Sequence, residues 1–207
     1  MAFTTFVNGN PAPASEQNEN FALIGRAAAF KSKVGQYYGP QIQGRSTANG
    51  TLNRLYFLPF IAGESFTADR IAVYCATYAA PGTTMRLGIY NSASGIPSTL
   101  KVDAGIVTFA ASATLYPIAI TQTLEPGVYW LAAAVQTAIN STYASGISSA
   151  SGGGAFGMPM NSDFTIGTWP ELYHLTGQSG SLPTTVTSTD IGIGSGTRGP
   201  VIALRRA

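Results

Sequence analysis

The chain of 207 residues carries few charges, 10% of its residues, and a formal net charge of only +2. Its 24 glycines and 12 prolines together outnumber the charged residues, which favours a turn-rich all-β protein over a helical one. The 11 basic residues form no run of the kind that follows phosphates, so the composition argues against a nucleic-acid partner.

Targeting and membrane segments are not recognisable in the sequence. The first 21 residues contain no basic stretch followed by an apolar one, and no segment reaches the roughly 18 uncharged apolar residues of a membrane helix. We therefore expect synthesis in a cytoplasm and no membrane insertion. The single cysteine, Cys75, excludes an intramolecular disulfide, and its place in the apolar alternation of "RIAVYCAT" predicts a buried, inert thiol.

Residues 1–36 are expected to form an arm rather than part of a sheet. The prolines of "NGNPAPAS" favour turn and extended chain, and Ser15 is a typical helix N-cap. A short helix would follow through "EQNENFALIGRAAAFKSKV", with Phe21, Ile24 and Ala28 along one face. So narrow an apolar stripe is marginal alone, so we expect this helix to order only against a partner or copies of itself.

From Gln36 onward the apolar pattern changes to period two, which predicts a domain over 37–207. The expected fold is an all-β, jelly-roll-like antiparallel β-sandwich of about eight strands. Pro59 argues that its strand is an edge or carries a bulge, and Ala104–Gly105 interrupts another strand. The expected strands cover 54–62, 69–77, 84–91, 100–109, 113–120, 125–136, a segment from 164 and 200–207.

The segment "EPGVYWLAAAVQ" predicts a turn followed by a strand that is apolar on both faces, as a central strand covered on both sides would be. Val128, Trp130 and Ala132 share one face, and Tyr129 lies on the other. We expect the Trp130 side to fill the core between the sheets and the Tyr129 side to need a second cover.

Catalytic and metal-binding patterns are sparse. His174 is the only histidine, no nucleophile elbow occurs, and Cys75 is distant in sequence, so neither a triad nor a zinc site is expected. Two distant carboxylates could meet in space to hydrolyse glycosides, although turn capping is the better interpretation of the nine acids. We expect no enzymatic activity, no cofactor and no metal.

Several aromatic side chains are expected in or near loops, where they could stack on sugars or pack against neighbouring subunits. They are Tyr143, Trp169 and Tyr173, and His174 is expected beside them at a surface or interface. An equally good interpretation is that these aromatics fold down as lids on the sandwich.

Four segments together resemble a known family. They are "GTLNRLYFLPFIAGESFTADRIAVYCAT", "MRLGIYNSASGIPSTLKVDAG", "TLEPGVYWLAAA" and the closing "PVIALRR". In this order they resemble the β-sandwich domain of tailed-bacteriophage virion proteins, which is found at the tips of tail fibres and tailspikes and in capsid decoration proteins. The resemblance covers roughly residues 37–207, and "FVNGNPAPASEQNENF" resembles, over a shorter span, the attachment segments of such proteins.

The resemblance implies a homotrimer, which would supply the second cover of the central strand. Within this family, a short arm followed by one globular domain, without a long fibre shaft, implies a capsid decoration (cement) protein. Such a protein would lie on the outer surface of the virion, with the major capsid protein lattice as partner. The expected lattice contacts lie in the arm: Phe3, Phe6, Phe21, Ile24, Arg26, Lys31 and Lys33. The same arm residues could instead pack onto their own trimer. The alternative function is a short tail fibre or tailspike tip that binds host-surface glycan through the loop aromatics.

Overall fold

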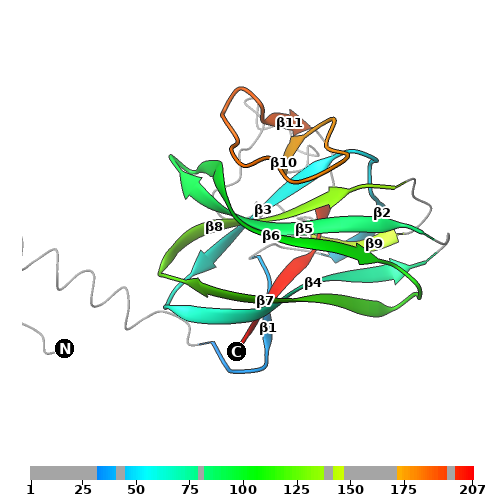
Figure 1. Cartoon of the computed structure of the whole chain (residues 1–207). Coiled ribbons are helices and arrows are strands. Elements are labelled where there is room, and N and C mark those ends of the chain that lie inside the picture. Colours follow the sequence, from blue (N-terminus) through cyan, green and yellow to red (C-terminus); the bar gives the residue numbers. More distant parts are fainter. Residues whose placement is uncertain (1–31, 41–44, 79–81, 138–141, 147–171, 195–198) are drawn as a thin grey trace, which may run out of the picture.

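Two antiparallel β-sheets pack face to face in the computed structural model (Figure 1). The structure describes residues 32–40, 45–78, 82–137, 142–146, 172–194 and 199–207, and the expected helix of the arm lies outside them. Within these ranges there are thirteen strands and no helix, and every strand pair is antiparallel. The expected all-β sandwich is therefore confirmed.

The first sheet has seven strands, and the long strand β4 is its centre. The order is β1-β13-β4-β9-β12, with β2 paired to β9 and β7 paired to β4. Its strands are β1 (Tyr37–Tyr38), β2 (Arg45–Asn49), β4 (Phe66–Thr77), β7 (Thr114–Leu124), β9 (Thr142–Gly146), β12 (Gly199–Pro200) and β13 (Ile202–Arg206).

The second sheet has six strands in the order β11-β10-β3-β8-β5-β6. Its strands are β3 (Leu55–Ala62), β5 (Thr84–Ala93), β6 (Ile96–Thr108), β8 (Gly127–Val135), β10 (Leu172–Leu175) and β11 (Gly192–Gly194). The described strands exceed the expected eight because short segments such as β1, β11 and β12 are too brief to give a periodic pattern.

The main core lies between the two sheets, since its buried side chains come from both. Along β4 and β5, every second residue is apolar and lies in this core, as the alternation in the sequence predicts. These residues are Ile71, Val73, Cys75, Met85, Leu87 and Ile89. Period-two patterning is thus sufficient to identify the inward residues of strands that have one polar face.

The faces of β8 are the reverse of what the sequence indicates. Tyr129 and Leu131 lie in the core between the sheets, whereas Trp130 and Ala132 lie in a second cluster on the outer face of the second sheet. The expectation that Trp130 fills the inter-sheet core was wrong. Alternation fixes which residues share a face, but a strand that is apolar on both faces does not say which face meets the other sheet.

The second cover of β8 comes from the chain itself and not from a neighbouring subunit. We call residues 176–191, which join β10 to β11, the cover segment. Its Leu182 and Val186 are buried together with Trp130. Three hydrogen bonds fasten it to the sheet: Tyr90 Oη to Pro183 O (2.8 Å), Leu100 N to Thr184 O (2.9 Å) and Val186 N to Ser98 O (2.7 Å). The trimer expected from the resemblance is not needed to bury this face.

Proline and glycine affect two strands differently. β3 lies between β10 and β8, and its Pro59 pairs with Trp130 of β8 without a register shift. In β6, Gly105 has φ +95°, and the register with β5 shifts beside it. The expectation of an edge strand or a bulge at Pro59 was therefore wrong, whereas the interruption expected at Gly105 is confirmed as a bulge.

Candidate functional site

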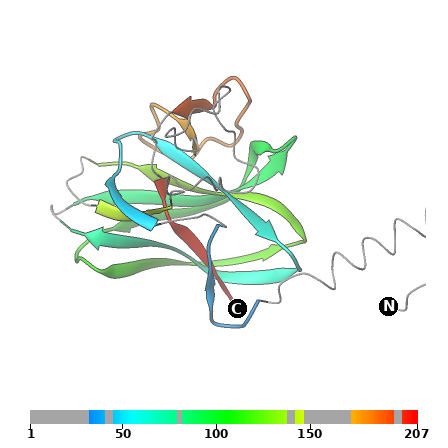
Figure 2. The ribbon, with the colours of Figure 1, turned by 180° about the vertical axis from the view of Figure 1, so that it is seen from behind.

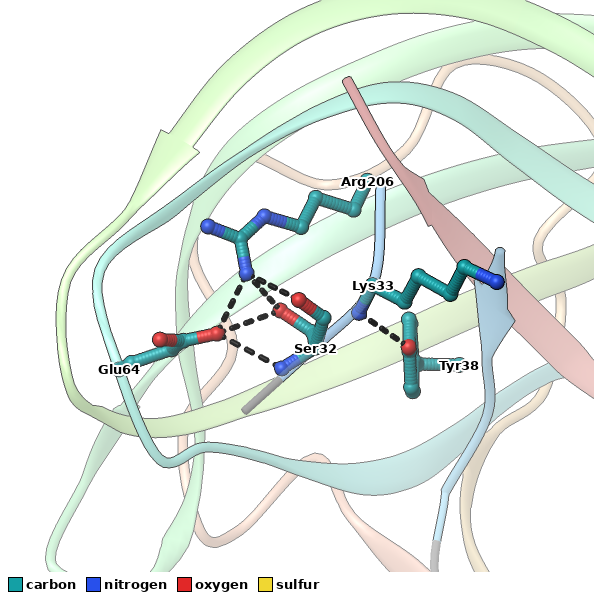
Figure 3. Close-up of polar contacts among 5 residues, drawn as sticks. All are labelled: Ser32, Lys33, Tyr38, Glu64 and Arg206. Carbon is teal, nitrogen blue, oxygen red and sulfur yellow. Dashed lines mark hydrogen bonds and ion pairs between the residues drawn. The ribbon is translucent and has the colours of Figure 1, made fainter. Parts of the chain in front are cut away.

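The best-defined polar cluster of the described residues lies where the chain leaves the preceding segment and joins the sandwich (Figure 3). We call Ser32, Glu64 and Arg206 the clamp. Glu64 Oε1 accepts hydrogen bonds from Ser32 N and Ser32 Oγ, both at 2.7 Å, and from Arg206 Nη1 at 2.6 Å. Arg206 Nη1 also donates to Ser32 Oγ at 2.8 Å and to the Ser32 carbonyl. Three segments far apart in sequence are thus joined at one carboxylate.

Each member of the clamp is positioned by a different part of the fold. Glu64 lies in the turn between β3 and β4, and Arg206 ends β13. The backbone holds the third segment: Gly35 N donates to Arg206 O at 2.9 Å, and Arg206 N donates to Gln36 O at 3.1 Å. Gly35 has φ +78°, a conformation that glycine adopts without strain, so the chain can turn here and run back into β1.

Hydrogen bonds from Ser32, and after them the charge of Arg206, stabilise the ionised form of Glu64. The hydrogen bonds from Ser32 lower the pKa of the Glu64 carboxyl, and the Arg206 guanidinium lowers it further. The two side chains of the ion pair are only about a quarter exposed, 26% and 27%. The carboxylate therefore stays charged to a lower pH than an ordinary glutamate does.

A second ion pair lies beside the clamp on β13. Arg205 Nε and Nη2 donate to the two carboxylate oxygens of Asp69, at 2.8 and 2.5 Å. This bidentate contact lowers the pKa of Asp69 and raises that of Arg205. The last two arginines of β13 are thus both paired to acids at the start of β4 or in the turn before it, which secures the end of the chain.

The arrangement is suited to holding a segment, because Glu64 Oε1 and Arg206 Nη1 bond each other and both bond Ser32. Within the described part of the chain, no three His, Cys, Asp or Glu side chains group together as metal ligands would. The same part contains no helix with the length and apolarity of a membrane span.

The aromatic residues expected on loops lie in the second sheet instead. Tyr173 is in β10, half-buried, with its ring 5.2 Å from that of Trp130. His174 is buried, lies opposite Tyr56 in the ladder, and has its Nδ1 3.3 Å from Leu172 O. Their expected location on a loop or edge was wrong, because β10 is paired on both sides, to β3 and to β11.

Most of the other expected site residues fall outside the described ranges. Of the expected lattice contacts in the arm, only Lys33 is described: its side chain is exposed, and its backbone N–H donates to Tyr38 Oη (Figure 3). For Tyr143 the structure describes the backbone alone, in β9. The residues outside are Phe3, Phe6, Phe21, Ile24, Arg26, Lys31 and Trp169.

Sequence reasoning missed all three members of the clamp. Ser32 and Glu64 are 32 positions apart, and Glu64 and Arg206 are 142 positions apart, so no local pattern connects them. The available signal was a lone acid in a turn, "AGES", and paired arginines at the end of the final strand.

Neither protein-family models, nor curated protein sequences, nor solved structures give a significant match to the chain. The function must therefore be argued from the residues and their geometry.

Proposed function

We propose that the chain is a non-enzymatic structural protein of a bacteriophage virion, a capsid decoration (cement) protein. Its N-terminal arm would bind the major capsid protein lattice, and its β-sandwich would project outward as a homotrimer. The observation that carries this proposal is the clamp, which ties Ser32, near the end of the arm, to both the β3–β4 turn and the last strand.

A protein that attaches through a terminal arm must pass any load on that arm into its folded domain. The clamp does this at a point where β13 lies beside β4, the longest strand of the first sheet. Figure 2 gives the same relation from behind: the blue segment, in which the end of the arm runs into β1, lies beside the red strand β13 at one edge of the sandwich. A pulling force on the arm would therefore act on hydrogen-bonded strands and not on an unpaired terminus.

Arm binding would stabilise a capsid by mass action, because the protein would bind the assembled shell and not its separate subunits. Exposed Lys33, next to the clamp, supports a contact with an acidic lattice surface. The alternative function, a fibre tip that binds host-surface glycan, has less support from Tyr173 and His174, since one packs on Trp130 and the other is buried.

The test is immunogold electron microscopy of intact particles of the virus that encodes the chain, with antibody raised against the purified protein. Label spread over the head in many copies is the expected result. Label confined to the tail tip would favour the glycan-binding alternative, and particles without label would refute a virion role.

The contribution of the clamp is tested by binding full-length variants to particles that lack the protein. Glu64→Gln should weaken binding or shorten its lifetime. Glu125→Gln, at an exposed acid in the β7–β8 turn, is the matched control and should bind as the wild type does.

A further inference from the structure

The side chain of Arg54 is half-buried and has no anion beside it among the described residues. Arg54 comes directly before β3, its guanidinium bonds no described residue, and its Nε is buried without an acceptor. A buried donor without an acceptor costs free energy, and an unpaired buried charge costs more. Folded proteins usually place an acceptor, a water or an ion at such an atom.

The fold holds this side chain on the inner face of the second sheet, at one end of the sandwich. Asn53, with φ +58°, forms a bulge with Arg54: Asn53 N donates to Val135 O at 2.8 Å, and Val135 N donates to Arg54 O at 3.1 Å. Arg54 therefore lies opposite Val135, whose side chain is in the core between the sheets. Tyr56, two residues further along β3, lies on the same face.

The Tyr56 hydroxyl is a second donor at this end of the sheet. It is part-buried and accepts a hydrogen bond from Thr51 N at 3.0 Å. Thr51 O in turn accepts a hydrogen bond from Arg54 N at 3.3 Å, so the hydroxyl lies at the turn that carries Arg54. The O–H of Tyr56 donates to no described residue. We call Arg54 and Tyr56 the donor pair.

The described elements around the donor pair supply no carboxylate. β10 contributes His174, the ladder partner of Tyr56. β12 of the facing sheet contributes Gly199, where an added Cβ would lie 3.5 Å from Tyr56 Cβ. The five described acids are engaged or lie elsewhere: Glu64, Asp69 and Asp103 pair with other arginines, Asp190 accepts from Thr187, and Glu125 precedes the far end of β8.

We infer that the donor pair is a binding site for a small oxyanion from solution, such as phosphate or a carboxylate. Arg54 is half-buried although its Nε is enclosed, so part of the side chain stays open to solvent. The planar fork of a guanidinium matches the oxygens of either anion, and the Tyr56 hydroxyl adds a neutral donor. The site does not depend on a role in a virion.

Isothermal titration of the full-length protein with sodium phosphate, and separately with sodium acetate, tests the site at constant ionic strength in chloride buffer. Saturable binding of at least one of the two anions is expected. Arg54→Gln should weaken this binding by about tenfold or more, and Tyr56→Phe by about fivefold, as the loss of hydrogen bonds to a charged group implies. No saturable binding to the wild type, or equal binding by Arg54→Gln, overturns the inference. Unchanged binding by Tyr56→Phe overturns the part assigned to Tyr56.

The matched control is Arg70→Gln. Arg70 is also half-buried and forms no ion pair with a described residue, but its Nη1 donates to Asp69 O at 3.3 Å, and the Asp69 carboxylate is close to its charge. That carboxylate repels an added anion, so Arg70→Gln should bind phosphate or acetate as the wild type does. An equal loss of binding in Arg70→Gln and Arg54→Gln would mean general attraction to positive charge and would overturn the site.

Nitrogen-15 NMR follows the site directly. The Nε–H signal of Arg54, assigned by its loss in Arg54→Gln, should shift as the anion is added, with the same midpoint as the calorimetric titration. The Nε–H signal of Arg86, which donates to Asp103 at 2.8 Å, should stay in place. An Arg54 signal that does not move with either anion overturns the inference.

Discussion

Gly88 of β5 is the position where the attachment of the cover segment can be tested most sharply. A Cβ added to Gly88 would lie 2.3 Å from Leu182 Cδ1 of the cover segment and 2.8 Å from the Val102 carbonyl oxygen of β6. Overpacking of this kind costs about 1 to 3 kcal/mol, and restriction of the unfolded chain returns about 0.4 to 1 kcal/mol. At the middle of these ranges Gly88→Ala should lower the free energy of unfolding by about 1.3 kcal/mol, and at most by about 2.6 kcal/mol.

The assay is urea unfolding followed by tryptophan fluorescence, with Gly180→Ala as the control. Gly180 lies in the cover segment itself, and an added Cβ would meet nothing within 4 Å. This control should be neutral or stabilising by a few tenths of a kcal/mol. If the two variants unfold at the same urea concentration with equal m-values, the packing of the cover segment on β5 is not as described.

A double variant separates the two clashes at Gly88. Leu182→Ala alone should cost about 2 to 5 kcal/mol, because Leu182 is buried. If Leu182 causes most of the overpacking, Gly88→Ala/Leu182→Ala will cost less than the sum of the single variants. If the Val102 carbonyl causes it, the two costs will add.

Three further predictions concern the core and the clamp. Because burial raises the pKa of the Cys75 thiol, the native protein should react with a thiol reagent at pH 8 only as fast as it unfolds, and rapid reaction without urea would contradict this. Trp130→Phe, which removes the 3.2 Å hydrogen bond to Ser92 Oγ and part of the stack on Tyr173, should lower stability by about 1 to 2 kcal/mol in urea unfolding. Glu64→Gln should be less stable than the wild type at neutral pH. The folded-state pKa of Glu64 lies below its ordinary value of 4.5. The stability difference between wild type and variant should therefore be fully present above pH 4.5 and vanish as the pH falls through the lowered pKa. A stability difference that persists in stronger acid would refute an effect of the ionised carboxylate.

Period-two patterning predicted the parts of the fold that depend on near neighbours in sequence. The inward rows of β4 and β5 could be predicted because their opposite faces contain polar residues such as Arg70 and Arg86. The bulge at Gly105 could be predicted because glycine adopts positive φ without strain.

The cover segment could not be recognised from the same kind of pattern. The sequence 176–191 is mostly glycine, serine, threonine and proline, a composition that is typical of a loop. Its attachment depends on two buried apolar side chains, Leu182 and Val186, and on backbone bonds to β6 such as Leu100 N to Thr184 O. Such bonds join backbone atoms of segments that are distant in sequence. The periodicity of the side chains therefore does not predict them.

The two faces of β8 illustrate where the sequence stops being sufficient. A strand that is apolar on both faces carries no local signal that distinguishes a core between sheets from a core under a covering segment, so the face of Trp130 could not be assigned from β8 alone. Tyr90 of β5 is the direct ladder partner of Trp130, and alternation along β5 puts Tyr90 on the face opposite to Met85, Leu87 and Ile89. Partners in a ladder share a face, so the inward row of β5 and the register together require Trp130 to face outward. The register was the missing information, and it is set by contacts between strands rather than within either one.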